Sequence, residues 1–236
     1  MTVIQGIIFD KDGTLFDFNG TWGAWAGVMI AQEAQGDVAL ADALAKAMGY
    51  DMVGQRFLPE SIVIASTAKQ TAQHLRTVLP DVTLDDLLGR MNHAAGSVPQ
   101  VQAVPLIPYY DALKARGLKL GIATNDAEEP ARKNLTNAGI LDHFDFIAGY
   151  DSGHGGKPAP GQLHAFCAAT GLQPDNCAMV GDSTHDLKAG RAAGMLTIGV
   201  LTGPAPQAEL DPFADIVLPN IGHIPGWLMQ ENLIAR

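Results

Sequence analysis

Two aspartates separated by one residue, Asp10 and Asp12, directly follow a short apolar run near the start of the chain. Three further polar clusters follow later apolar runs: Thr124 with Asn125, Lys157, and Asp182 with Asp186. Carboxylates that gather without a cation repel one another, and their pKa values rise. Mg²⁺ prefers oxygen ligands and relieves such repulsion, whereas a set without thiols disfavours zinc. If the clusters converge, they predict a magnesium site.

The same residue types can carry out phosphoryl transfer. A carboxylate beside a metal ion can attack phosphorus and form an aspartyl-phosphate. The hydroxyl of Thr124, the amide of Asn125 and the ammonium of Lys157 can neutralise the phosphoryl oxygens. Each cluster alone also fits a turn, a helix cap or a solvated lysine. All four in this order, each after an apolar run, favour the catalytic interpretation.

Short runs rich in β-branched residues predict the strands that position these clusters. The runs cover residues 3–9, 118–124, 144–148, 178–181 and 196–200. Between the later runs lie helical patterns that end at Gly117, Gly139, Gly171 and Gly194. Strands that alternate with helices indicate a parallel sheet, and ligands bind at the carboxyl ends of its strands. The four polar clusters should therefore meet at one edge of the sheet.

Residues 16–97 show helical patterns without strand patterns between them. Asp37 is predicted to cap a helix that ends at Gly49, and a second helix is predicted over residues 64–79. Thr83 and Asp86 have the spacing of a capping box before a third helix. We therefore expect an all-helical insert at 16–97 within an α/β core formed by residues 1–15 and 98–236.

Several motifs together resemble the haloacid dehalogenase-like hydrolase superfamily, and most of all its phosphoglycolate phosphatases. These motifs are DKDGTLFD at 10–17, PYYDALKARGLKLGIATND at 108–126, GGKPAP at 155–160 and GDSTHDLKAGRAAGM at 181–195. With the helical insert, the resemblance covers essentially the whole chain. It implies an α/β fold with a Rossmann-like parallel sheet core, helices on both faces of the sheet, and an inserted all-helical cap domain.

The resemblance also implies individual roles. Asp10 would be the nucleophile, and Asp12 would be the general acid/base that protonates the leaving group and then activates water. Thr124 and Lys157 would hold the phosphate, together with Asn125. The expected reaction is Mg²⁺-dependent hydrolysis of a small phosphorylated metabolite through an aspartyl-phosphate, with a phosphoglycolate-type substrate as the first choice.

The implied metal ligands are Asp10, the backbone carbonyl of Asp12, Asp182 and Asp186, the last directly or through water. Dehalogenases of this superfamily lack a carboxylate at the position of Asp12. The sequence therefore favours a phosphatase over a dehalogenase.

Five residues have roles that the motifs leave open. Lys11 stands where these phosphatases usually have an apolar residue, and it could face solvent or adjust the local field. Trp22 and Trp25 fit the mouth of a substrate site or simple packing. Arg56 is the candidate in the cap for binding a second anionic group of the substrate. His154 lies between glycines and could reach the site or face solvent.

Composition limits the partners and the location. The chain of 236 residues has 15 Lys and Arg against 25 Asp and Glu, for a net charge of −10. This charge disfavours nucleic acids and anionic membranes as partners. No apolar run is long enough for a membrane span, and Asp10 and Asp12 interrupt any signal-peptide pattern. We therefore expect a cytoplasmic protein, with two reduced cysteines, as a monomer or a homodimer.

Two alternative functions remain open at this point. A sugar-phosphate mutase would use the same core but return the phosphoryl group to its substrate. A phosphoryl-accepting regulatory module also combines an aspartate, a hydroxyl and a lysine around Mg²⁺, but it needs neither Asp12 nor the helical insert. A binding-only protein is disfavoured because no motif position is lost.

Overall fold

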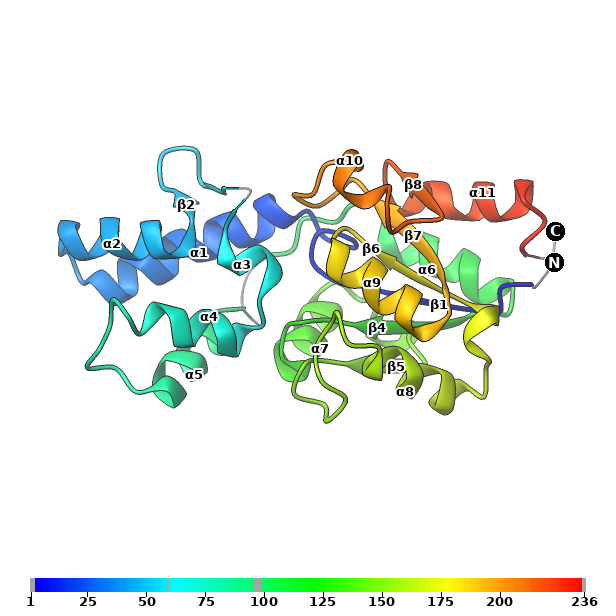
Figure 1. Cartoon of the computed structure of the whole chain (residues 1–236), viewed down its shortest axis with the longest axis horizontal. Coiled ribbons are helices and arrows are strands. Elements are labelled where there is room, and N and C mark those ends of the chain that lie inside the picture. Colours follow the sequence, from blue (N-terminus) through cyan, green and yellow to red (C-terminus); the bar gives the residue numbers. More distant parts are fainter. Residues whose placement is uncertain (1–2, 59, 96–98, 235–236) are drawn as a thin grey trace.

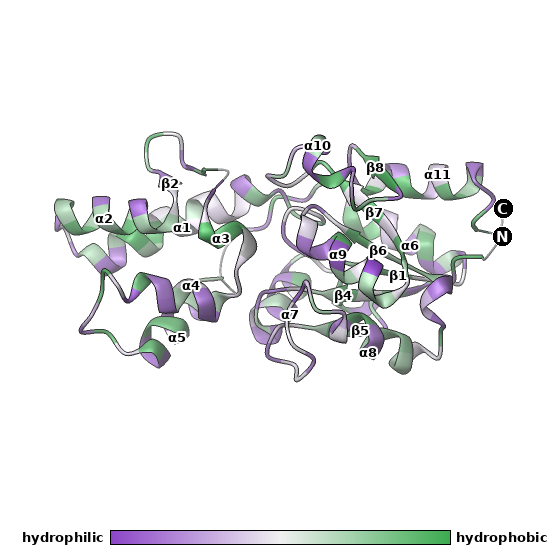
Figure 2. Ribbon diagram, in the orientation of Figure 1, coloured by the Kyte–Doolittle hydropathy of each residue, from purple (hydrophilic) through white to green (hydrophobic). Residues whose placement is uncertain are grey.

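The computed structural model of the protein describes residues 3–58, 60–95 and 99–234. Helices α1 to α5 lie on one side of the molecule, and a sheet with its surrounding helices lies on the other (Figure 1). The cap helices carry both hydrophobic and hydrophilic residues along their lengths (Figure 2). That pattern is expected of helices that pack on one side and face solvent on the other.

One six-stranded parallel sheet forms the larger half, with the order β5-β4-β1-β6-β7-β8. Its strands are β1 (Gly6–Phe9), β4 (Lys119–Ala123), β5 (Phe146–Ala148), β6 (Cys177–Gly181), β7 (Leu196–Val200) and β8 (Ile216–Leu218). Strand β1 lies in the middle, between β4 and β6, and all four of its residues are buried. The predicted parallel sheet is confirmed, and the three-residue strand β8 was not predicted.

Helices cover both faces of this sheet. They are α6 (Leu106–Ala115), α7 (Glu128–Asn137), α8 (Gly161–Thr170), α9 (Thr184–Ala193), α10 (Gln207–Leu210) and α11 (Ile224–Gln230), with short 3-10 helices η1 (Leu141–His143), η2 (Pro174–Asn176) and η3 (Ile221–His223). Successive strand residues point to opposite faces. Ile7 and Phe9 belong to the apolar cluster that includes α6 and α11, whereas Ile8 belongs to the cluster that includes α8 and α9. The predicted Rossmann-like arrangement is therefore confirmed.

The inserted region has its own apolar cluster, which includes Trp22, Trp25, Leu44 and Leu87. Its helices are α1 (Phe18–Ala34), α2 (Val38–Met48), α3 (Ile62–Ala65), α4 (Ala68–Leu75) and α5 (Leu84–Ala95). As predicted, Asp37 caps α2 by accepting a hydrogen bond from the backbone of Leu40 at 3.1 Å. The Thr83–Asp86 pair before α5 is also present, because the Asp86 backbone N–H donates to the Thr83 hydroxyl at 3.2 Å.

Two predictions for the insert are wrong in detail. The single helix over residues 64–79 is two helices, because Ser66 ends α3 and Thr67 begins α4 with a capping box to Gln70. The insert is also not entirely helical, since β2 (Tyr50–Asp51) and β3 (Arg56–Phe57) form a small antiparallel hairpin. Strands of two residues are too short for a sequence pattern to reveal.

Two adjacent segments connect the halves. The backbone N–H of Asp17 donates to the carbonyl of Val101 at 2.7 Å, and that of Ala103 donates to the carbonyl of Leu15 at 2.8 Å. The outgoing and returning chains therefore run side by side. The predicted boundary at 15/16 lies next to these contacts and stays a prediction, while the boundary at 97/98 lies outside the described residues.

Both cysteines are buried and free, as predicted. Among the described residues, no helix combines the length and the apolar character that crossing a membrane requires.

Candidate active site

Three buried aspartates meet where two central strands end. Asp10 directly follows β1, Asp182 directly follows β6, and Asp186 lies in the first turn of α9. Each has a carboxylate oxygen within 4.8 Å of one from the other two. The convergence of strand ends, predicted from the sheet, has therefore brought together carboxylates that are far apart in the sequence.

Lys157 joins this cluster from the loop between β5 and α8. Its Nζ lies 2.5 Å from Oδ1 of Asp10 and 2.6 Å from Oδ1 of Asp186. Asn125 fixes the loop, because its Nδ2 donates to the carbonyl of Lys157 at 3.1 Å and its Oδ1 accepts from the backbone N–H of Lys157 at 2.8 Å. Asn125 therefore positions Lys157 through the backbone.

Local structure fixes the remaining members of the site. Gly13 has a φ of +77°, and a Cβ there would overlap the carboxylate of Asp182, so only glycine lets this turn approach so closely. Ser183 caps α9, and its backbone N–H and hydroxyl donate to Oδ2 of Asp186 at 3.0 and 2.7 Å. Thr124 is buried, and its hydroxyl oxygen accepts a hydrogen bond from the backbone N–H of Asp126 at 3.0 Å.

Burial and mutual repulsion disfavour negative charge on the aspartates. Burial raises the pKa of Asp10 to about 7, Lys157 opposes that shift, and Asp186 and Asp12 add to it. Burial, Asp10 and Asp186 together raise the pKa of Asp182 well above its usual range. Burial lowers the pKa of Lys157, but Asp10 and Asp186 outweigh it, so that its pKa rises overall. One lysine shared by three carboxylates leaves negative charge for a cation to balance.

The donor set fits a divalent ion such as Mg²⁺. Asp10, Asp182 and Asp186 offer only oxygen atoms, which magnesium prefers, and none of the described residues in this cluster is a cysteine or a histidine.

Lys11 is completely buried, so the interpretation that it faces solvent is wrong. Its Nζ lies 2.7 Å from Oδ1 of Asp12 and 3.4 Å from Oδ2 of Asp126, and it donates to Oδ1 of Asn134 at 3.2 Å. It also lies 5.3 Å from the centre of the Trp22 ring. Burial lowers the pKa of Lys11, but Asp12 and Asp126 outweigh it, so that its pKa rises overall. Lys11 therefore adjusts the local field as a permanent cation beside Asp12.

Substitution of Lys11 by methionine is expected to lower the free energy of unfolding by about 3 kcal/mol, because Asp12 and Asp126 would lose a buried cation. Urea denaturation near neutral pH measures this change. Lys69→Met is a matched control at an exposed position of α4 and should stay within about 0.5 kcal/mol of the parent. A loss for Lys11→Met no larger than that of the control would contradict a stabilising role for this pair.

A cavity lies between the cap helices and the strand ends. The core contributes the acidic cluster, Lys157, Thr124, Asn125 and His185, and the cap contributes residues of α1, α3, α4 and α5. Its volume is about 100 Å³, enough for several waters or a small organic phosphate. Trp22 and Trp25 line this cavity and also belong to the apolar cluster of the cap. These tryptophans therefore both line the candidate substrate cavity and pack in the interior of the cap.

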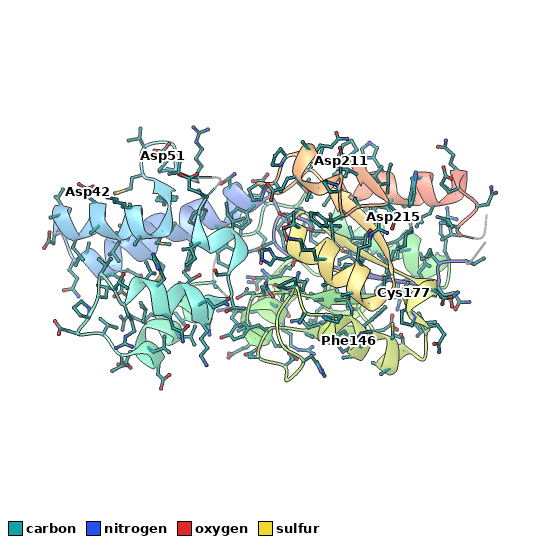
Figure 3. All side chains as sticks on the ribbon, viewed as in Figure 1. Asp42, Asp51, Phe146, Cys177, Asp211 and Asp215 are labelled. Atoms are coloured by element: carbon teal, nitrogen blue, oxygen red, sulfur yellow. The ribbon has the colours of Figure 1, made fainter. Side chains whose placement is uncertain are left out.

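Seven of the eight predicted site residues line this cavity, and one does not. The seven are Asp10, Asp12, Thr124, Asn125, Lys157, Asp182 and Asp186. Arg56 lies elsewhere: its side chain is 67% exposed and pairs with Asp51 at 3.7 Å in the small hairpin. Figure 3 labels Asp51 at the outer edge of the cap, away from the core. Arg56, the predicted cap residue for substrate binding, therefore does not line the cavity, and His154 is exposed outside it.

Sequence reasoning assigned no role to two further residues that line the cavity. Asp126 follows the Thr124–Asn125 motif directly, and burial raises its pKa to about 6 although Lys11 opposes the shift. Lys11 lies between Asp10 and Asp12 in the sequence, and Asp126 follows another polar motif. These positions could have suggested that Lys11 and Asp126 form an ion pair. Asn92 lies on α5, and nothing in the sequence distinguishes it from other polar residues of that helix.

Comparison with known proteins decides the family. A family model described as haloacid dehalogenase-like hydrolase matches residues 4–194. The chain belongs to the haloacid dehalogenase-like hydrolases. Its predicted resemblance to this family, and its prediction as a hydrolase, are confirmed.

Relatives of this hydrolase include proteins named phosphoglycolate phosphatase. One from Neisseria gonorrhoeae (strain ATCC 700825 / FA 1090) is 41% identical in an alignment of 218 positions, which covers 85% of the chain and 81% of the relative. One from Rhodospirillum rubrum is 31% identical in an alignment of 233 positions, which covers 95% of the chain and 90% of the relative. A solved structure described as a predicted phosphoglycolate phosphatase from Haemophilus somnus 129pt has a TM-score of 0.73 at 21% identity, covering 96% of this hydrolase and 99% of that chain.

Proposed function

We propose that this hydrolase is a Mg²⁺-dependent phosphomonoesterase that acts on small phosphorylated metabolites through an aspartyl-phosphate. The observation that carries the proposal is the cluster of Asp10, Asp182 and Asp186 around Lys157 at the floor of the cavity. Phosphatases named among the relatives support the reaction class. A cytoplasmic location, a monomer or homodimer, and the lack of nucleic acid or membrane partners stay predictions.

The nucleophile in this proposal is Asp10. Its carboxylate is held by Lys157, whose charge favours the ionised form that can attack phosphorus. Lys157 and the hydroxyl of Thr124 line the same cavity and can stabilise the phosphoryl oxygens as negative charge develops. A bound Mg²⁺ held by Asp10, Asp182, Asp186 and the Asp12 carbonyl would supply further charge neutralisation.

Asp12 is proposed as the general acid/base. Its side chain is 15% exposed and lines the cavity, so it can reach the leaving oxygen of an ester bound to Asp10. It would donate a proton to that oxygen when the ester bond breaks, and later take a proton from the water that hydrolyses the aspartyl-phosphate. Lys11 holds the Asp12 carboxylate in place through both steps.

Release of inorganic phosphate from p-nitrophenyl phosphate and from a panel of small phosphate esters tests the function. The panel includes phosphoglycolate, the substrate named for the relatives, and ranks the esters by kcat/KM. Turnover of a simple monoester without a bisphosphate primer would exclude the sugar-phosphate mutase. Phosphorylation of the protein without turnover would instead favour the regulatory module.

The raised pKa of Asp10 predicts how Mg²⁺ stabilises the protein at different pH values. Without an ion, folded Asp10 keeps its proton up to about pH 7, whereas the unfolded chain releases it near pH 4, so stability falls as pH rises through this window. An ion that binds the ionised form offsets this loss above the window. We expect Mg²⁺ to raise Tm more at about pH 8 than at about pH 5. Thermal scans measure this difference, and equal shifts at both pH values would contradict it.

A further inference from the structure

The cap side of the cavity carries no charge. Its described residues are apolar except for Ser66, Thr71 and Asn92 and for the indole N–H groups of Trp22 and Trp25. Arg56, the one cationic candidate in the sequence for this role, pairs with Asp51 outside the cavity. The part of a substrate that lies under the cap therefore meets a neutral surface with a few hydrogen-bonding groups.

Two of those groups are buried donors without a partner. Trp22 is 8% exposed and Trp25 is 4% exposed, and neither Nε1 has a hydrogen-bond partner among the described residues. The two rings pack edge to face, with centroids 5.3 Å apart, so each limits the movement of the other. A buried N–H without a partner costs about 1–3 kcal/mol, so two of them beside one cavity need an explanation. A hydrogen-bond acceptor on a bound ligand would satisfy these donors.

A residue that lines the same cavity carries a buried acceptor without a partner. Oδ1 of Asn92 is buried and has no hydrogen-bond partner among the described residues. A carboxylate only accepts hydrogen bonds, whereas a hydroxyl both accepts and donates. Hydroxyl groups can therefore satisfy the indole donors and the Asn92 acceptor together.

The charges around the cavity also favour a leaving group without a carboxylate. Asp12 and Asp126 both line it, and they share the single buried cation Lys11. The contact that Oδ2 of Asp126 makes with this cation is long, at 3.4 Å. A carboxylate on the leaving group would add negative charge beside these two acids, with no cation on the cap side to offset it.

We propose that the cap side of the cavity selects phosphate esters whose leaving group is uncharged and bears hydroxyl groups, such as a phosphorylated polyol or sugar. Trp22 and Trp25 donate hydrogen bonds to its oxygen atoms, and Asn92 accepts a hydrogen bond from a hydroxyl. This inference rests on the proposed phosphatase function and narrows its substrate class. It differs from the phosphoglycolate-type substrate expected from the sequence, whose carboxylate would lie under the cap.

Two small esters form a matched pair for the test. 2-Hydroxyethyl phosphate and 2-phosphoglycolate differ only in a hydroxymethyl group against a carboxylate. The expected result is a kcat/KM at least about tenfold higher for 2-hydroxyethyl phosphate, since one hydrogen-bonding mismatch in a buried site has an effect of that size or larger. Equal values, or a preference for phosphoglycolate, would overturn the proposal. This comparison uses the unmodified protein and does not depend on the folding of any variant.

Trp22→Phe and Trp25→Phe then test the two donors, because phenylalanine keeps an aromatic ring but lacks the N–H. Each should lower kcat/KM for 2-hydroxyethyl phosphate about tenfold more than it lowers kcat/KM for phenyl phosphate, which has no hydroxyl. Trp227→Phe on α11, outside the cavity, is the matched control. Equal losses on both esters, or no loss on either, would contradict the assigned donors.

These outcomes are separable from a failure of the phosphatase proposal. If the unmodified protein releases no phosphate from phenyl phosphate, the proposed function fails and the inference fails with it. If it hydrolyses phenyl phosphate but does not prefer 2-hydroxyethyl phosphate over phosphoglycolate, only the inference about the leaving group fails.

Discussion

Asp10→Asn is expected to lower kcat for p-nitrophenyl phosphate by at least about 10⁴-fold, which is typical for removal of a nucleophile. An asparagine amide oxygen cannot form the acyl-phosphate that the proposed reaction requires. The fold should survive, because the ionised form of Asp10 is disfavoured by burial and Lys157 keeps its contact with Asp186. Steady-state phosphate release and a thermal scan measure the two effects.

Two further variants make this result decisive. Asp10→Ala guards against deamidation of the asparagine back to aspartate. Asp42→Asn is the matched control, because Asp42 is exposed on α2 and lies at the end of the cap away from the core (Figure 3). Turnover by Asp10→Asn and Asp10→Ala within tenfold of the control would exclude Asp10 as the nucleophile.

Removal of divalent cations by EDTA is expected to lower turnover by about 10³-fold, and added Mg²⁺ should restore it. Metal ions contribute several kcal/mol to such reactions, and 1.4 kcal/mol corresponds to a factor of ten. Here the ion would balance Asp10, Asp182 and Asp186; Lys157 pairs directly with Asp10 and Asp186. Phosphate release after chelation and after addition of Mg²⁺ measures the effect.

The control for chelation is EDTA already saturated with Mg²⁺, which should leave turnover unchanged. Asp182→Asn should require a higher Mg²⁺ concentration for half-maximal activity, because it removes one charged ligand. A protein that stays fully active in excess EDTA would rule out the proposed dependence on a metal.

The sequence predicted those parts of the fold that depend on short-range patterns. The runs before Asp10, Thr124 and Asp182 are buried strands, and their parallel pairing follows from the helices between them. Because strand ends meet at one edge of a parallel sheet, the positions of the acids could be inferred without coordinates. The hairpin at residues 50–57 and strand β8 were not predicted, since strands of two or three residues are too short to show a recognisable hydrophobic period.

Roles that depend on long-range packing could not be predicted. Whether Arg56 faces the cavity depends on how the hairpin lies against α1, and no local pattern encodes that arrangement. The burial of Lys11 could not be predicted either, because it requires Asp126, Asn134 and Trp22 to approach from three different parts of the chain. The unpaired indole nitrogens became visible only once the packing of the cap was known.

The position of β1 in the sheet also constrains the order in which the chain can fold. Both partners of β1 lie far along the chain, since Gly6 pairs with Lys119 and with Cys177. The apolar cluster of the cap, in contrast, involves only residues up to Ala95. During synthesis the cap can therefore pack before β4 and β6, the strands that pair with β1, have been made, because contacts between nearby residues form first. Asp10 gains Asp182 and Asp186 only when β6 and α9 emerge, so the acidic cluster is among the last features to assemble.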